Sequence, residues 1–163
     1  MQANRFVVFL VLTLSYFAVG IMAKKVAGLV VFRRTNDTNA IEYLMLKPKS
    51  NKKKWSPPKG RVDDGEDFFT AAVRETHEET RYTVGDLNIH MEHNQAMEQP
   101  MKKGKKKTVK FWLAELKDGN KQPKLSHEHS EYRWMSKEDA ILICDIPEFT
   151  EILNEFDGFA KTL

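Results

Sequence analysis

The chain has 163 residues, which allows one domain with a single sizeable core and is too short for two ordinary domains. Hydrophobic residues make up 41% of it and charged residues 30%, a composition typical of a globular chain and not of a disordered one. The formal net charge of +3 is too small to identify a polyanionic partner. Cys144 is the single cysteine, so an internal disulfide is excluded.

Residues 1–23 differ in composition from the rest of the chain. Arg5 precedes an uncharged apolar run that ends in small residues just before Lys24. This pattern is typical of a secretory signal, and a run of about 18 residues is also just long enough for a membrane anchor. A third interpretation is that translation starts at Met22, which would make residues 1–23 a non-native extension and the protein cytoplasmic. The lone cysteine fits the reducing cytoplasm, whereas a signal predicts the secretory pathway, and a membrane is a partner only if the segment stays uncleaved.

Residues 24–163 are predicted to form one domain, because no repeat, linker or second change of composition interrupts them. Strands are predicted at residues 26–32, 41–46, 87–91, 108–115 and 131–135, helices at 68–80, after Ser136 and at 147–156, and loops at 51–60 and 92–107. Ser136 with Asp139 three residues later indicates a capping box. The core stripe of the first helix is expected to consist of Phe69, Val73, Thr76 and Thr80. This order of elements predicts an α/β fold in which helices cover both faces of a mixed sheet.

The first predicted helix carries an unusual cluster of carboxylates. At 100° per residue, Glu75, Glu78 and Glu79 share one face, and like charges at this spacing cost roughly 0.2–0.5 kcal/mol per pair. Arg74 is spaced to offset Glu78 only. Two interpretations are open: a solvated acidic face, or a site in which a divalent cation supplies the missing charge. Carboxylate oxygens suit Mg²⁺, and Mn²⁺ is the alternative.

The carboxylate cluster belongs to a longer motif. The pattern G-x5-E-x7-R-E-U-x-E-E-x-G-U, in which U is apolar, is the Nudix box, and the residues of this chain that match it are Gly60, Glu66, Arg74, Glu75, Glu78 and Glu79. Two positions depart from the box, Thr76 at an apolar position and Arg81 at the last glycine. That glycine suits a left-handed helix end, so Arg81 is expected to cost about 1 kcal/mol. The resemblance implies a Nudix α/β/α sandwich with a mixed sheet between helices, and Mg²⁺-dependent hydrolysis of a diphosphate linkage.

The resemblance extends to most of residues 24–163. Segments 27–34, 55–60, 107–114 and 125–129 are similar to the asymmetric diadenosine tetraphosphate hydrolases of animals, a branch of the Nudix family. This similarity implies in-line attack of water on the polyphosphate, which converts diadenosine tetraphosphate to ATP and AMP. It also implies a small-molecule nucleotide substrate, and we expect a monomer.

The match to the box implies roles for individual residues. Glu75 and Glu79 are implied as metal ligands, Glu78 as a further ligand or the catalytic base, and Glu66 as an additional or outer ligand. Arg74 is implied to orient a glutamate through a charge-assisted hydrogen bond.

Outside the box, the resemblance implies that Glu128 is a base or lies near the metal, and that Lys59 and Lys107 bind the phosphate chain. The opposite interpretation is that all three are solvated loop residues. His127 and His129 flank Glu128, and this HxH pattern by itself is a weak indication of a transition-metal site.

The chain departs from the resembled family in the segments that would hold the substrate. The family's adenine-stacking tyrosine is replaced by Pro100, and residues 92–107 contain no Phe, Tyr or Trp. Phe156 and Phe159 remain as candidate stacking platforms, unless they pack in the core. Positions where the family often has histidines are lysines here, at 52–54. A diphosphoinositol polyphosphate or a 5′-polyphosphate RNA is therefore an alternative substrate, and a non-catalytic polyanion-binding protein is a further alternative. No nucleic-acid partner is expected, because the basic loops lack interleaved aromatic residues.

Overall fold

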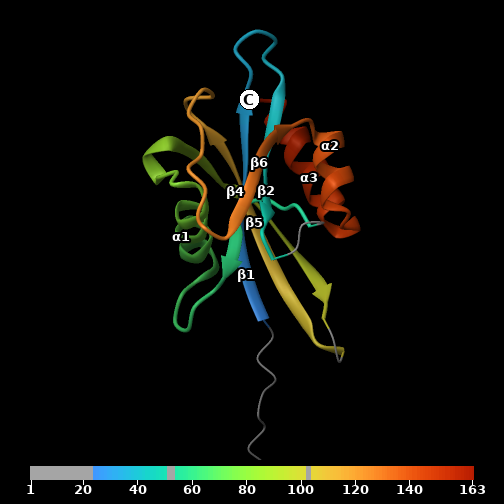
Figure 1. The fold of residues 1–163 in the computed structure, drawn as a ribbon. Helices are drawn as coiled ribbons and strands as arrows, with labels where there is room; N and C mark the ends of the chain where they lie inside the picture. Colours follow the sequence, from blue (N-terminus) through green and yellow to red (C-terminus); the bar gives the residue numbers. More distant parts are fainter. Residues whose placement is uncertain (1–23, 51–53, 102–103) are drawn as a thin grey trace, which may run out of the picture.

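The computed structural model describes residues 24–50, 54–101 and 104–163 (Figure 1). The elements are β1 (Lys24–Arg34), β2 (Ile41–Pro48), β3 (Lys59–Arg61), α1 (Phe68–Thr80), η1 (Val84–Asp86), β4 (Leu87–Pro100), β5 (Lys106–Leu116), β6 (His129–Met135), α2 (Lys137–Cys144) and α3 (Pro147–Ala160). The predicted signal or anchor at residues 1–23 lies outside the described residues. Within the described residues, no helix combines the length and the apolar composition needed to cross a membrane.

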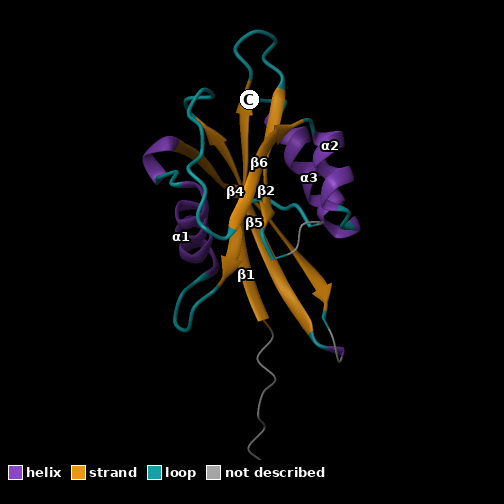
Figure 2. Ribbon diagram, in the orientation of Figure 1, coloured by secondary structure: helices purple, strands orange, loops and turns teal. Residues whose placement is uncertain are grey.

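The sheet lies between two helical layers, with α1 on one face and α2 and α3 on the other (Figures 1 and 2). Its strand order is β4-β5-β1-β2-β6, and β3 pairs with β1. The central strand β1 runs parallel to β5 and antiparallel to β2. Alternate residues of β1 enter different cores, Val30 on the side of α3 and Leu29 on the side of α1, so both faces of the strand are buried. The predicted mixed sheet between helices is confirmed.

β3 lies in a segment that the sequence predicted as a loop. It has three residues, and it pairs with the first half of β1 through Gly28 opposite Lys59 and Val26 opposite Arg61. A Cβ at Gly28 would overlap the Pro58 carbonyl oxygen and the Lys59 side chain, so only glycine allows this close pairing. The pairing fixes the chain that carries Lys59 beside α1.

β4 is longer than predicted and takes in most of the expected loop at 92–107. Its outer half pairs with β5 from Asn94 opposite Trp112 to Pro100 opposite Lys106, after an irregularity in the register that follows His90. The segment is polar because β4 is an edge strand with one solvated face. Local composition therefore predicted a loop where pairing to a distant strand makes a sheet.

The predicted bounds of α1 are confirmed, but its predicted core stripe is only half right, since Thr76 and Thr80 are buried as expected. The buried residues are Ala71, Ala72, Thr76, Glu79 and Thr80, whereas Phe69 and Val73 are only partly buried. The two alanines allow the helix to pack closely on β1 and β5. The structure thus turns the small residues, and Glu79 with them, toward the sheet.

The ends of the helices follow the predicted caps. The Ser136 side chain accepts a hydrogen bond from the Asp139 amide at 3.1 Å, as the capping box predicts. Arg81 adopts a left-handed conformation with φ 63° and caps α1 by donating its amide hydrogen to the His77 carbonyl oxygen. The local geometry expected from the box is retained although glycine is absent, so the expected cost of about 1 kcal/mol applies.

Candidate active site

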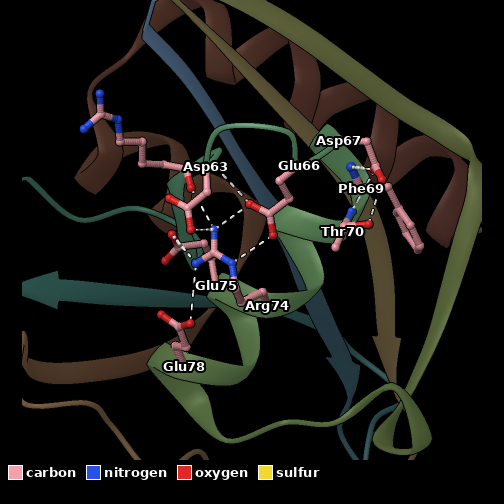
Figure 3. A network of polar contacts seen from close by, with 9 residues as sticks. Asp63, Glu66, Asp67, Phe69, Thr70, Arg74, Glu75 and Glu78 are labelled. Atoms are coloured by element: carbon pink, nitrogen blue, oxygen red, sulfur yellow. Dashed lines mark hydrogen bonds and ion pairs between the residues drawn. The ribbon is translucent and has the colours of Figure 1, made fainter.

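Arg74 is the centre of a carboxylate network on the exposed side of α1 (Figure 3). Its guanidinium donates to both oxygens of Glu66, at 2.9 and 2.8 Å, and to Glu75 Oε1 at 2.9 Å. A longer contact of 3.4 Å reaches Glu78, and a bond of 2.9 Å reaches the Arg61 carbonyl oxygen. Arg74 thus fixes the loop before α1 to the helix and holds three glutamates around one cation.

The contacts of Arg74 in this network differ from the single ion pair that the sequence predicted. The sequence predicted an ion pair of Arg74 with Glu78 alone. In the structure the guanidinium lies 2.9 Å from Glu75 and 3.4 Å from Glu78, so it contacts both carboxylates. The hydrogen bonds from Arg74 lower the pKa of Glu66, whose two oxygens are both engaged. In this arrangement Glu66 joins the loop before α1 to Arg74.

Glu79 is the most buried carboxylate of the motif, with 8% of its surface exposed. Its Oε2 accepts a hydrogen bond of 3.0 Å from the backbone amide of Lys59, and its Oε1 lies 3.6 Å from Nε2 of His129. Burial raises the pKa of Glu79 to about 8, and the nearby charges of Glu75 and Glu128 act in the same direction. The structure therefore concentrates carboxylate charge at a site where a cation would stabilise it.

Two cavities meet at Glu79. The first, the carboxylate cavity, has a volume of about 480 Å³, and its lining includes Glu75, Glu78, Glu79 and Glu128. The second, the lysine cavity, has a volume of about 500 Å³, and its lining includes Lys49, Lys54, Lys59 and Lys107. Lys59, Glu79 and Glu128 line both cavities. Arg61 and Arg81 also line the carboxylate cavity. A compartment rich in carboxylates and a compartment rich in lysines therefore share one wall.

A hydrogen bond fixes the side chain of Lys59 in the wall that the two cavities share. Its Nζ donates a hydrogen bond of 2.6 Å to Ser56 Oγ, and burial lowers the pKa of its ammonium group. Burial also lowers the pKa of Lys107, with the charge of Lys59 acting in the same direction. Two desolvated lysines in one cavity favour a polyanionic ligand, which would restore their charged forms.

The donor atoms around the carboxylate cavity decide whether it can hold a divalent cation. Among the described residues, no three side chains of His, Cys, Asp or Glu are already arranged as a metal centre. Glu75 is drawn to Arg74, and one oxygen of Glu79 accepts from the Lys59 amide. The donors are nevertheless hard oxygens around one cavity, with few ligands and room for water, as Mg²⁺ prefers. The donor set fits a magnesium ion, which Glu75 and Glu79 would hold, and Glu78 and Glu128 line the same cavity.

Phe156 was predicted as a substrate platform, and this prediction is wrong. Its exposed surface is 0%, and it packs in the core between the sheet and α3. The helical period turns Phe156 inward, whereas Phe159 is partly exposed and stacks on His93 with 3.3 Å between ring centroids. Neither side chain lines the lysine cavity.

His129 is a site residue that was not assigned a role in the Nudix site. Its ring contacts Glu79 with one nitrogen and Ser126 Oγ, at 3.3 Å, with the other. His127 is exposed, so the two histidines do not form the transition-metal site that their spacing weakly suggested. A Cβ at Gly60 would overlap the Glu75 carboxylate, so glycine at this position leaves room for that side chain to lie beside Arg74. The HxH spacing indicated that this segment belongs to a site, but only the fold shows that His129, and not His127, contacts Glu79.

Comparison with known proteins supports this assignment. The NUDIX domain profile matches residues 22–156. The asymmetrical bis(5′-nucleosyl)-tetraphosphatase of Caenorhabditis elegans is 42% identical over 138 residues, which cover 85% of this chain and 97% of that protein. The enzyme of the same name from Mus musculus is 39% identical over 142 residues, 85% of this chain and 96% of that protein. A crystal structure of a C. elegans Ap4A hydrolase binary complex superposes with a TM-score of 0.80 at 40% identity, covering 86% of this chain and all of that chain. The chain therefore belongs to the Nudix family and is a Nudix pyrophosphohydrolase.

Proposed function

We propose that the chain hydrolyses a dinucleoside polyphosphate, diadenosine tetraphosphate to ATP and AMP, by Mg²⁺-dependent in-line attack of water. The observation that carries this proposal is the wall shared by the two cavities, where Glu79 and Glu128 face Lys59. A polyphosphate lying across this wall would place its charge on the lysines and one phosphorus beside the carboxylates. The names of the relatives, which share 37–42% of the sequence, support a dinucleoside tetraphosphate as the substrate.

Each group of the site has a task in this reaction. A bound Mg²⁺ ion would neutralise charge on the phosphate oxygens and lower the pKa of its water. Glu75 and Glu79 would hold the ion, and Glu78 or Glu128 would accept the proton of the attacking water. Lys59 and Lys107 would fix the phosphate chain, so that water and leaving group lie in line. Mn²⁺ would serve with the same oxygen ligands.

A substrate panel tests this proposal. Diadenosine tetraphosphate, diadenosine triphosphate, a diphosphoinositol polyphosphate and a 5′-triphosphate RNA are incubated with Mg²⁺ in oxygen-18 water. We expect fastest turnover of diadenosine tetraphosphate, with ATP and AMP as products and the heavy oxygen in only one of them. Faster turnover of the inositol or RNA substrate would replace the proposed substrate.

A denser polyanion is the second candidate, and one observation favours it. Among the described residues that line the lysine cavity, the only Phe, Tyr or Trp is Trp55, which is 5% exposed. Lys47 and Arg133 lie over the Trp55 ring, at 5.5 and 4.9 Å from its centroid. An adenine therefore finds little open aromatic surface there, whereas phosphate groups find several lysines.

A further inference from the structure

The parallel pairing of β1 and β5 gathers lysines at one end of the sheet. Lys24 pairs with Lys107 and Lys25 with Thr108, so both strands begin at the same end. Lys105 and Lys106 begin the returning half of the β4–β5 hairpin beside them. We define the lysine end as Lys24, Lys25, Lys105 and Lys106, all of them exposed. None of these four forms an ion pair with another described residue.

The nearby carboxylates do not neutralise this end. Asp63 lies 3.7 Å from Arg74 and is paired there, whereas Glu98 keeps its charge, since its hydrogen bond of 2.6 Å comes from the neutral Thr108 hydroxyl, and it offsets one of the four lysines. Asp64 remains as an exposed carboxylate on the loop beside β3. The lysine end therefore carries an excess of positive charge that folding itself does not use.

Two further features point to a lipid surface as the partner. In the sequence the apolar run at residues 6–23 directly precedes Lys24, and Lys24 is the first residue of β1 at the lysine end. At the hairpin, Met101 exposes 38% of its surface, and its amide donates a hydrogen bond to the Lys105 carbonyl oxygen at 2.7 Å. An apolar segment next to a polybasic patch is the combination that holds peripheral proteins on anionic bilayers.

We propose that the lysine end is a docking surface for an anionic lipid bilayer. The ammonium groups would lie among the headgroups, Met101 would enter the interface, and the sheet would stand away from the bilayer. Single-stranded nucleic acid fits less well, because the aromatic ring beside this end, Phe68, is partly buried and has the Lys25 ammonium over it, 5.8 Å from the ring centroid, which leaves little open face for base stacking. This inference does not depend on the substrate of the enzyme.

The test uses residues 24–163, so that the apolar run itself does not contribute. A chain of this extent folds alone, because the similar C. elegans crystal structure is covered over 100% of its length by 86% of this chain. Binding is measured by co-sedimentation with phosphatidylcholine vesicles that contain 30% phosphatidylserine, and with vesicles of phosphatidylcholine alone. We expect binding to the anionic vesicles only, and its loss at 0.5 M salt.

Two charge-matched triple variants locate the surface. Lys24→Gln, Lys25→Gln and Lys106→Gln together are expected to weaken vesicle binding about a hundredfold, since each lysine near an anionic surface contributes about fivefold. The control changes the same charge at the far end of the sheet, with Lys117→Gln, Lys121→Gln and Lys124→Gln. The control should keep nearly full binding, and both variants should keep the hydrolysis rate of the parent on a soluble nucleotide.

Three results would overturn the proposal. The first is no binding of the parent to anionic vesicles at 0.1 M salt. The second is an equal loss in both triple variants, which would show a net-charge effect without a surface. The third is tighter binding to a single-stranded RNA oligonucleotide than to the vesicles at the same salt, which would make the lysine end a nucleic-acid surface.

Discussion

The guanidinium of Arg74 binds the Glu66 carboxylate through two parallel hydrogen bonds of 2.9 and 2.8 Å, across eight residues of chain. The same group contacts Glu75 and Glu78 (Figure 3). One planar cation thus sets the positions of two glutamates of the carboxylate face from outside the cavity, since Arg74 itself does not line it. Lysine cannot reproduce this fork, because its ammonium is a single point charge.

Replacement of Arg74 by lysine is expected to lower kcat by about ten- to a hundredfold, in the range found when partners of metal ligands are removed. KM should change little, because the lysine cavity is not touched. Steady-state kinetics over a range of Mg²⁺ concentrations measures both effects. Arg33→Lys is the control, since Arg33 pairs with Glu42 at 2.7 Å and lines neither cavity. A drop of equal size in the control would contradict the positioning role.

Replacement of Glu79 by glutamine is expected to remove several orders of magnitude of turnover while the protein stays folded. In the metal-free protein, burial raises the pKa of Glu79 to about 8. A raised folded pKa means that stability is highest below the unfolded pKa of about 4.3 and falls as pH rises through 8. Thermal unfolding in EDTA should therefore show a loss of stability between pH 5 and 8 that is smaller in Glu79→Gln.

Magnesium should reverse this loss in the parent protein. At a concentration of a hundred times Kd, a ligand of the folded state contributes about 2.7 kcal/mol. Mg²⁺ at pH 8 is therefore expected to raise Tm by several degrees in the parent and not in Glu79→Gln. If Glu79→Gln and Glu75→Gln both keep more than about a tenth of the rate, α1 does not carry the metal site.

An aromatic residue at Gln99 is expected to improve binding of an adenine nucleotide. Gln99 lines the lysine cavity, whereas Pro100, the position that the sequence singled out, is exposed and does not. Alternate residues of a strand face opposite sides, so a tyrosine at position 100 points away. Gln99→Tyr should lower KM for diadenosine tetraphosphate about tenfold at nearly constant kcat, since one stacked base contributes roughly 1–3 kcal/mol. Pro100→Tyr is the matched control and should leave KM unchanged; the reverse pattern would refute the assignment of the cavity.

Replacement of Phe156 by alanine is expected to lower the free energy of unfolding by about 3–5 kcal/mol, because the side chain fills a closed core. The folded fraction should keep its KM, since the ring does not reach the lysine cavity. Urea unfolding and kinetics at low temperature measure the two quantities. An increase in KM without loss of stability would restore Phe156 as a substrate platform.

The N-terminus of the protein from its native source distinguishes the three interpretations of residues 1–23. A terminus near Lys24 supports a cleaved signal, and a terminus at Met22 or Ala23 supports a cytoplasmic start. Intact Met1 in a membrane fraction supports an anchor, with the basic flank favouring a cytoplasmic domain. Mass spectrometry of the N-terminal peptide measures this directly. In all three cases residues 24–163 should be fully active, because β1 begins at Lys24.

The sequence by itself determined the features that are encoded locally. The bounds of α1, the capping box at Ser136 and the burial of both faces of β1 follow from residues next to one another in the chain. The carboxylates at Glu75 and Glu79 follow from the spacing of one motif on one helix. Such signals depend on helical period, caps and hydrophobic runs, which need no knowledge of the fold.

Only the tertiary structure decided which side chains enter the site. Pairing with β5 made a strand of the polar segment after Met91, and thereby turned Gln99 toward the cavity in place of Pro100. The packing of α3 buried Phe156, and the approach of the segment after β5 brought His129 to Glu79. Each of these outcomes depends on partners far apart in the sequence, because strand pairing and burial are properties of the assembled sheet and not of its segments.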